Sequence, residues 1–152
     1  GLALAGMQGL AGRGARMEVP AHGGAALLID ESYNANPTSM AAALAVLRGM
    51  GGGKAAGGRR IAVLGAMREL GAGSHAEHAA LAPAIAEAGV AELALVGPEM
   101  TALKADGAAY LPDWQAALEW TRGMLKAGDI LLVKGSNSVG LGRLVSELKG
   151  GR

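Results

Sequence analysis

The sequence contains no cysteine and no phenylalanine among its 152 residues. Without cysteine there is no disulfide framework, no thiolate metal site and no cysteine nucleophile. Aromatic residues make up only 3% of the chain, so the core must consist of Leu, Val, Ile, Ala and Met. No apolar run approaches the about 20 residues of a membrane span, and no basic segment marks a signal peptide. We therefore expect a cytoplasmic protein with no membrane insertion.

Neither basic nor acidic residues predominate, because 14 basic residues balance 13 acidic ones and leave a net charge of +1. A broad basic surface for nucleic acid is therefore not expected. The 26 glycines follow no fixed period, which excludes a collagen-like repeat. With 51% hydrophobic residues, the chain has the composition of one folded domain of ordinary size.

Short apolar runs alternate with amphipathic stretches from residue 25 onward. This order predicts an α/β fold with a mostly parallel sheet of about six strands and helices on both faces. An N-terminal β-hairpin precedes it, with its turn at 22–24. Asn36 and Pro37 have the residue types of an N-cap and a first helical position. The predicted strands are 15–20, 25–30, 60–65, 91–97, 108–112 and 129–136, and further predicted helices are 75–89, 98–107, 113–128 and 139–149.

Polar residues cluster where three of the predicted strands end, at 30–36, 66–78 and 134–138. Ligands of open α/β sheets bind outside the carboxyl ends of the strands. These three clusters are therefore the candidate binding residues of the chain.

The first cluster allows two interpretations. Exposed N–H groups at a helix start favour an anion, Glu31 could bind a ribose hydroxyl, and Tyr33 could lie against a flat base. Alternatively, Asn36 is only the helix cap and the other residues form the turn. Capping explains Asn36 but leaves Glu31, Tyr33 and Asn34 unexplained.

The last cluster, 134–138, begins with a lysine directly after an apolar strand. Lys134 could reach a phosphate or a carboxylate as a point charge, and donors in the following loop could bind the same anion. The alternative is a polar loop with another helix cap. We favour a binding role because the lysine emerges directly from the strand.

Two further patterns are weaker. His75 and His78 have the i, i+3 spacing of a shared metal site, but no third ligand has an obvious spacing, so capping or solvated histidines are favoured. The stretch 48–55 resembles the phosphate-binding loop G-x-x-x-x-G-K-[ST]. It has Ala55 after the lysine, Arg48 in place of the first glycine, and a preceding helix instead of a strand. We therefore reject an ATP-hydrolysing loop here.

The clusters together resemble a known family. "LIDESYNANPTSM" (28–40), "IAVLGAMRELGAGSHAEH" (61–78) and "GDILLVKGSNS" (128–138) are similar to the C-terminal domain of the Mur ligases. The S-Y-N-A-N-P block is typical of the branch that adds D-Ala-D-Ala to UDP-MurNAc-tripeptide in peptidoglycan synthesis. The similarity runs from Arg13 to Leu148.

The resemblance implies a Rossmann-like domain at 15–150, preceded at 1–14 by the tail of another domain or a linker. It implies a three-domain ligase of cell wall biogenesis whose N-terminal and central domains are the partners of this one. ATP and Mg²⁺ would be bound mostly by the central domain and would activate the tripeptide carboxylate as an acyl phosphate. We expect no catalytic residue and no metal site in this domain alone, and no activity of the isolated domain.

The resemblance also assigns residues to two ligands. The family motifs place D-Ala-D-Ala against the loop after the last strand and against the 66–78 loop. Two departures, Ala66 where the family has Asp and Asn137 where an Arg often stands, leave the detailed dipeptide contacts open. The expected ATP-binding residues are Arg13, Glu31, Tyr33, Asn34, Asn36 and Pro37, and the expected dipeptide-binding residues are Lys134, Gly135, Ser136, Asn137, Glu69 and His78.

A different class of function remains open on the residues alone. A standalone α/β module that binds a nucleotide or an anion without chemistry would carry the same clusters. It predicts measurable ATP affinity for the isolated chain, whereas the ligase interpretation predicts weak affinity or none.

Overall fold

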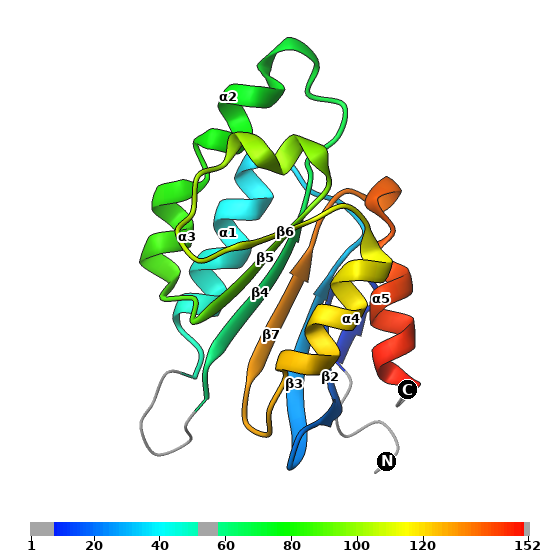
Figure 1. Ribbon diagram of the computed structural model, residues 1–152. Coiled ribbons are helices and arrows are strands. Elements are labelled where there is room, and N and C mark those ends of the chain that lie inside the picture. The colour runs from blue at the N-terminus through cyan, green and yellow to red at the C-terminus, as the bar shows by residue number, and fades with distance from the viewer. Residues whose placement is uncertain (1–7, 52–57, 151–152) are drawn as a thin grey trace.

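The computed structural model describes residues 8–51 and 58–150, which form one seven-stranded sheet with helices on both faces (Figure 1). The strand order is β1-β2-β3-β7-β4-β5-β6. β1 and β2 are antiparallel to their neighbours, and the other pairs are parallel. The strands are β1 (Gln8–Leu10), β2 (Arg13–Ala21), β3 (Gly24–Glu31), β4 (Arg60–Gly65), β5 (Glu92–Val96), β6 (Ala109–Leu111) and β7 (Ile130–Lys134).

The central strands form the core because both faces of the sheet are covered. Every residue of β7 is buried, as is every residue of β4 after Arg60. Strands covered on both faces need continuous apolar runs, and "IAVLG" and "ILLV" provide them. The core therefore consists mainly of Leu, Val, Ile, Ala and Met, as the lack of aromatic residues requires.

Helices α1 and α3 lie on one side of the sheet, and α4 and α5 lie on the other (Figure 1). In α1 the buried side chains are Met40, Ala43, Leu44 and Leu47, which recur at helical spacing. None of the helices in the described ranges has the length and apolar character needed to cross a bilayer. The helices are α1 (Pro37–Arg48), α2 (Ser74–Ala79), α3 (Ala82–Ala88), α4 (Trp114–Met124) and α5 (Leu141–Lys149), with short 3₁₀ turns η2 (Gly71–Gly73), η3 (Pro98–Ala102) and η4 (Asn137–Val139).

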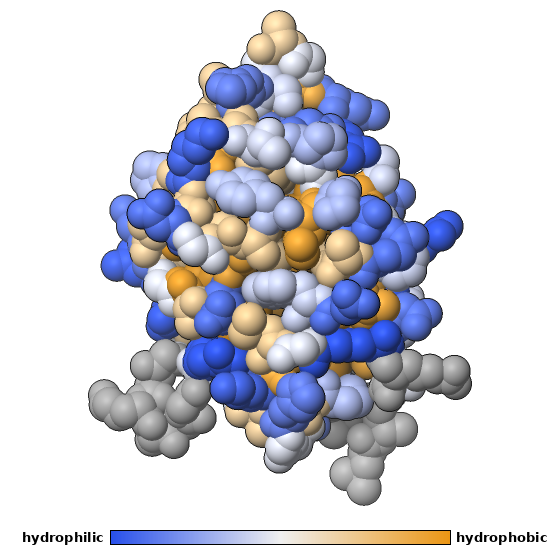
Figure 2. All heavy atoms as spheres, in the orientation of Figure 1, coloured by the Kyte–Doolittle hydropathy of each residue, from blue (hydrophilic) through white to orange (hydrophobic). Residues whose placement is uncertain are grey.

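The outer surface is mixed in character. Figure 2 shows hydrophilic side chains interspersed with apolar ones over the face seen in Figure 1. The large apolar residues that are exposed come from separate elements, and they include Tyr33 of the first polar cluster. They are Leu10, Tyr33, Val46 and Tyr110.

The connections create a crevice at one edge of the sheet. β3 and β7 are parallel neighbours, but β3 leads into α1 and β7 leads into α5, and these helices cover opposite faces (Figure 1). The loops after the two strands therefore diverge, as they do at the switch point of other doubly wound sheets. All three polar clusters follow strands that end at this edge.

The predicted fold class is confirmed, and the strand count is seven where about six were expected. The additional strand is β1, which lies in the segment expected to be a tail or linker. Residues 8–14 form β1, a turn and the start of β2. Residues 1–7 of the expected tail and residues 52–57 of the expected loop lie outside the described residues.

Two predicted helices differ from the structure. The stretch 75–89 is split into α2 and α3, and Pro83 stands in the first turn of α3, where its missing N–H is tolerated. The stretch 98–107 forms only the 3₁₀ turn η3. The N-cap expected at Asn36 is confirmed, because Asn36 accepts from the N–H of Ser39. Asp113 caps α4 in the same way and accepts from the N–H of Ala116.

Two glycines allow the loop after β7 to approach the end of β4. A Cβ atom on Gly135 would lie 2.9 Å from the Cα atom of Gly65 and 3.0 Å from a methyl group of Leu141. A Cβ atom on Gly65 would lie 2.9 Å from the same methyl group. Gly135 therefore brings two of the polar clusters together through backbone packing.

We predict that Gly135→Ala lowers the free energy of unfolding by about 1–3 kcal/mol, because backbone atoms must shift to accept the methyl group. The matched control is Gly123→Ala, at an exposed position of α4 where an added Cβ meets nothing within 4 Å. This control should be neutral or stabilise the protein by up to about 1 kcal/mol, because alanine is the better helix former. Urea denaturation of both variants measures the difference. Equal effects would contradict the packing role of Gly135.

Candidate functional site

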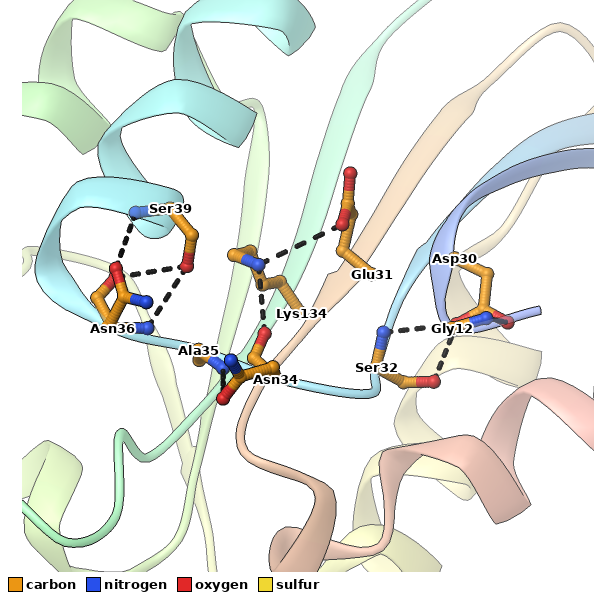
Figure 3. A network of polar contacts seen from close by, with 9 residues as sticks. All are labelled: Gly12, Asp30, Glu31, Ser32, Asn34, Ala35, Asn36, Ser39 and Lys134. Atoms are coloured by element: carbon orange, nitrogen blue, oxygen red, sulfur yellow. Dashed lines mark hydrogen bonds and ion pairs between the residues drawn. The ribbon is translucent and has the colours of Figure 1, made fainter. Parts of the chain in front are cut away.

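The site begins with the cap of α1. The N–H of Ser39 donates to Oδ1 of Asn36 at 2.8 Å, and the N–H of Asn36 donates to Oγ of Ser39 at 3.0 Å (Figure 3). This reciprocal capping box fixes the helix start, with Pro37 following the cap. The structure thus gives Asn36 and Pro37 a capping role, while their contact with a nucleotide remains a prediction.

Asp30 is buried at the end of β3 and accepts several hydrogen bonds from the surrounding loops. Its carboxylate is 3% exposed and accepts three hydrogen bonds. The donors are the N–H of Gly12 at 2.7 Å, the N–H of Ser32 at 3.1 Å and the hydroxyl of Ser32 at 2.5 Å (Figure 3). Asp30 therefore fastens the turn between β1 and β2 to the loop after β3.

The same turn holds an arginine over an aromatic ring. The guanidinium carbon of Arg13 lies 4.1 Å from the ring centroid of Tyr33, a favourable cation–π distance. The N–H of Tyr33 donates to the carbonyl of Gly12 at 3.0 Å. A Cβ atom on Gly12 would lie 2.9 Å from that of Tyr33, so only glycine fits at this contact. Arg13 and Tyr33 thus form one unit at the mouth of the crevice.

Lys134 ends β7 beneath this loop and is 3% exposed. Its ammonium donates to the carbonyl of Asn34 at 2.9 Å and lies 3.9 Å from Oε1 of Glu31 (Figure 3). Burial lowers the pKa of Lys134 from its ordinary value, and the Glu31 carboxylate opposes this shift. A buried cation thus stands at the base of the crevice.

Two adjacent pockets open at this edge of the sheet. The first, of about 390 Å³, is lined by Gly12, Arg13, Glu31, Tyr33, Asn34, Ser39 and Lys134. The second, of about 440 Å³, is lined by Tyr33, Asn34, Arg68, Glu69, Ser136, Asn137 and Ser138. Tyr33 and Asn34 line both pockets and separate one from the other.

Charges differ between the two pockets. The first contains the cations of Arg13 and Lys134 and the carboxylate of Glu31. The second contains Arg68 and Glu69, and Arg68 also pairs with Glu99 at 2.8 Å. The first pocket therefore suits a ligand with negative charge and hydroxyl groups, and the second suits a small zwitterion.

Loops from two strands meet in the second pocket. The hydroxyl of Ser136 accepts from the N–H of Arg68 at 2.7 Å, and the N–H of Ser136 donates to the carbonyl of Ala66 at 3.1 Å. Glu69 has φ +69°, the only positive value of a non-glycine residue in the described part of the chain. Such strain is often found at functional sites, and here it places an exposed carboxylate in the pocket.

His78 forms hydrogen bonds within the 67–78 loop. It is fully buried, its Nε2 accepts from the N–H of Met67 at 2.9 Å, and its Nδ1 donates to the carbonyl of Ser74 at 2.7 Å. Both ring nitrogens are therefore engaged within the chain, in the tautomer with hydrogen on Nδ1. This geometry supports a role in shaping the 67–78 loop.

The three clusters expected from sequence come together, but their members contribute differently. Arg13, Glu31, Tyr33 and Asn34 line the first pocket together with Lys134, which was expected beside the dipeptide. Ser136, Asn137 and Glu69 line the second pocket. Arg68 and Ser138 also line the second pocket and belong to the predicted clusters, although neither was assigned to a ligand. Gly12 and Ser39 line the first pocket and lie outside those clusters.

A third cavity, of about 550 Å³, lies away from these residues. It is lined by residues of α3, the start of β5 and the loop 104–107. None of the residues expected to bind a ligand lines it. Within residues 8–51 and 58–150, no group of three or more His, Cys, Asp or Glu residues is arranged to hold a metal ion.

Comparison with known proteins assigns the chain to a family. The family model described as "Mur ligase, glutamate ligase domain" matches residues 15–137. The chain belongs to the Mur ligase family. Among curated relatives, the UDP-N-acetylmuramoyl-tripeptide–D-alanyl-D-alanine ligase of Mycobacterium tuberculosis is 36% identical over 155 residues, covering 88% of this chain and 30% of the relative. The corresponding ligase of Escherichia coli is 35% identical over 127 residues, covering 81% and 27%.

Solved structures agree on the fold. MurF from Acinetobacter baumannii matches 94% of this chain with a TM-score of 0.74 and 30% identity, over 31% of its own length. MurF from Thermotoga maritima, solved with ADP, matches 98% with a TM-score of 0.75 and 24% identity, over 33% of its length. The chain thus spans about 30% of the length of the curated Mur ligases that it matches.

We predict that Asp30→Ala lowers the free energy of unfolding by about 2–3 kcal/mol, because buried N–H and hydroxyl donors lose their acceptor. Glu18→Ala, on an exposed position of neighbouring β2, is the control and should change stability by less than about 0.5 kcal/mol. Thermal and urea unfolding measure both. A small effect at Asp30 would show that the carboxylate does not fasten the two loops.

Proposed function

We propose that this chain is the C-terminal domain of a ligase that joins D-Ala-D-Ala to UDP-MurNAc-tripeptide at the expense of ATP. The observation that carries the proposal is the pair of pockets divided by Tyr33 and Asn34. Both residues belong to the S-Y-N-A-N-P block, the part of the sequence most typical of this branch. The curated relatives that match most of this chain carry the name of that activity.

The first pocket supports the nucleotide side of the proposal. Glu31 is positioned to accept from ribose hydroxyl groups, as acidic residues do in other nucleotide-binding folds. Arg13, held over Tyr33, supplies positive charge for phosphate oxygens. The relative from Thermotoga maritima was solved with ADP, which is the same class of ligand.

The residues present fit a nucleotide but not a magnesium ion. Mg²⁺ prefers oxygen ligands in octahedral geometry, usually carboxylates together with phosphate oxygens. The described part of the chain has one carboxylate, Glu31, in the first pocket. We therefore assign Mg²⁺ to the central domain of the complete enzyme.

The second pocket supports the dipeptide side. A dipeptide in solution carries an ammonium group and a carboxylate. Glu69 provides a carboxylate for the ammonium group, while Ser136, Asn137 and Ser138 provide hydroxyl and amide donors for the carboxylate. Because Ser136 Oγ accepts from the Arg68 N–H, the loops of β4 and β7 hold this pocket in one shape.

The reaction needs positioning more than acid–base chemistry. ATP supplies a phosphoryl group that activates the tripeptide carboxylate, and the amine of D-Ala-D-Ala then forms the amide bond as phosphate leaves. Placing amine and activated carboxyl group together lowers the barrier through proximity, and closure of the domain keeps water from the activated group. This domain contributes the two binding surfaces on which that closure depends.

The test is ligation by the full-length protein. With ATP, Mg²⁺, UDP-MurNAc-tripeptide and D-Ala-D-Ala, we expect ADP release and a product heavier by the dipeptide, read by mass spectrometry. Omitting the dipeptide should abolish product. The 152-residue chain alone should release no ADP above background, because the tripeptide and most phosphate contacts lie in other domains.

Two outcomes would contradict the proposal. One is transfer of a single amino acid by the full-length protein in preference to the dipeptide. The other is tight ATP binding by the isolated chain, measured by calorimetry, together with no ligation by the full-length protein. The second outcome would favour a nucleotide-binding module without chemistry.

A further inference from the structure

Lys134 and Glu31 are placed side by side by strand register. β3 and β7 are parallel neighbours, and the Cα atoms of Glu31 and Lys134 are partners at the last position of the pairing. The side chain of Lys134 is 4% exposed and that of Glu31 is 30% exposed. The cation therefore lies at the base of the first pocket, and the carboxylate reaches toward its opening.

The Lys134 ammonium makes two polar contacts, and both are with residues that line the first pocket. Its ammonium lies between Oε1 of Glu31, at 3.9 Å, and the carbonyl of Asn34, at 2.9 Å (Figure 3). Both partners line the first pocket, and Asn34 also lines the second. Lys134 thus restrains the Glu31 carboxylate through the ion pair and restrains the turn at Asn34 through the hydrogen bond.

We propose that Lys134 is a positioning residue for nucleotide binding, which orients the Glu31 carboxylate and the Asn34 turn, and that it does not contact the dipeptide. This assignment rests on the proposed function and deepens it. The sequence motif suggested that Lys134 binds the dipeptide, whereas this proposal assigns it to the nucleotide-binding pocket.

The residues that follow Lys134 line a different pocket from the lysine itself. Lys134 lines the first pocket, while Ser136, Asn137 and Ser138, which follow it closely, line the second. Gly135 between them packs against Gly65. The K-G-S-N-S sequence (134–138) therefore places a buried cation at the first pocket and hydroxyl and amide donors at the second.

The energetic argument concerns a buried charge. An ammonium group removed from water is costly unless it is paired and hydrogen-bonded. Lys134 donates one hydrogen bond to a backbone carbonyl and forms a longer ion pair with Glu31. Without the lysine, Glu31 loses the cation that restrains it and the Asn34 carbonyl loses its donor, so both nucleotide-facing groups become less ordered.

The test uses Lys134→Met in the full-length protein, because methionine is similar in length and uncharged. Calorimetry measures binding of a non-hydrolysable ATP analogue, and steady-state kinetics measures the KM for ATP and for D-Ala-D-Ala. We expect nucleotide affinity to fall about tenfold, as for the loss of one charge-assisted contact. The KM for the dipeptide should stay within about twofold.

Asn137→Ala is the matched control, three residues farther along the same loop and in the second pocket. It should raise the KM for D-Ala-D-Ala and leave nucleotide affinity within about twofold. A third variant, Glu31→Gln, should weaken nucleotide binding by itself. Lys134→Met added to Glu31→Gln should cost less than about threefold more, because the lysine acts through the carboxylate.

The outcomes separate this inference from the proposed function. If the wild-type protein binds no nucleotide, the proposed function fails and this assignment fails with it. If the wild-type protein binds nucleotide and ligates the dipeptide, but Lys134→Met raises only the KM for D-Ala-D-Ala or changes neither value, the assignment alone is wrong. Loss of folding in Lys134→Met, monitored by thermal unfolding, would assign the lysine to stability and would also overturn it.

Discussion

The site depends on the parallel pairing of β3 with β7. This pairing sets Glu31 beside Lys134 and ends both strands at one edge of the sheet. Because side chains alternate along a strand, a shift of one strand by one residue would turn its charged side chain to the other face and separate Glu31 from Lys134. Two largely buried apolar runs, "LLI" (27–29) and "LLV" (131–133), fix the register, so the core of the domain determines where its charges lie.

Around this pairing, buried contacts position the loops, and more exposed groups face the two pockets. Asp30 holds the turn that carries Arg13, and Gly135 allows the loop after β7 to approach β4. The groups that face the pockets are more exposed, such as Tyr33 and Glu69. The pockets are thus preorganised, because the groups that line them are supported by buried residues behind them.

Sequence predicted most of the elements and the edge of the sheet where the clusters meet, because apolar periodicity and capping residues are local signals. It missed β1, the division of 75–89 into two helices and the 3₁₀ turn within 98–107. It did not predict which pocket each residue lines. Lys134 follows the K-G-S pattern but lies under the Asn34 carbonyl, a contact across 100 residues. The burial of His78 and the pairing of Arg68 with Glu99 are also long-range consequences of packing, and β1 is too short to show a period of its own.

We expect one crevice to hold a nucleotide and a dipeptide in separate pockets divided by Tyr33 and Asn34. Hydrogen–deuterium exchange of the full-length protein tests it most directly, with each ligand added alone. A non-hydrolysable ATP analogue should slow exchange at residues 31–35, and D-Ala-D-Ala should slow exchange at 68–69 and 136–138. Slowed exchange at the cavity formed by α3 and the 104–107 loop, with none at this edge of the sheet, would contradict it.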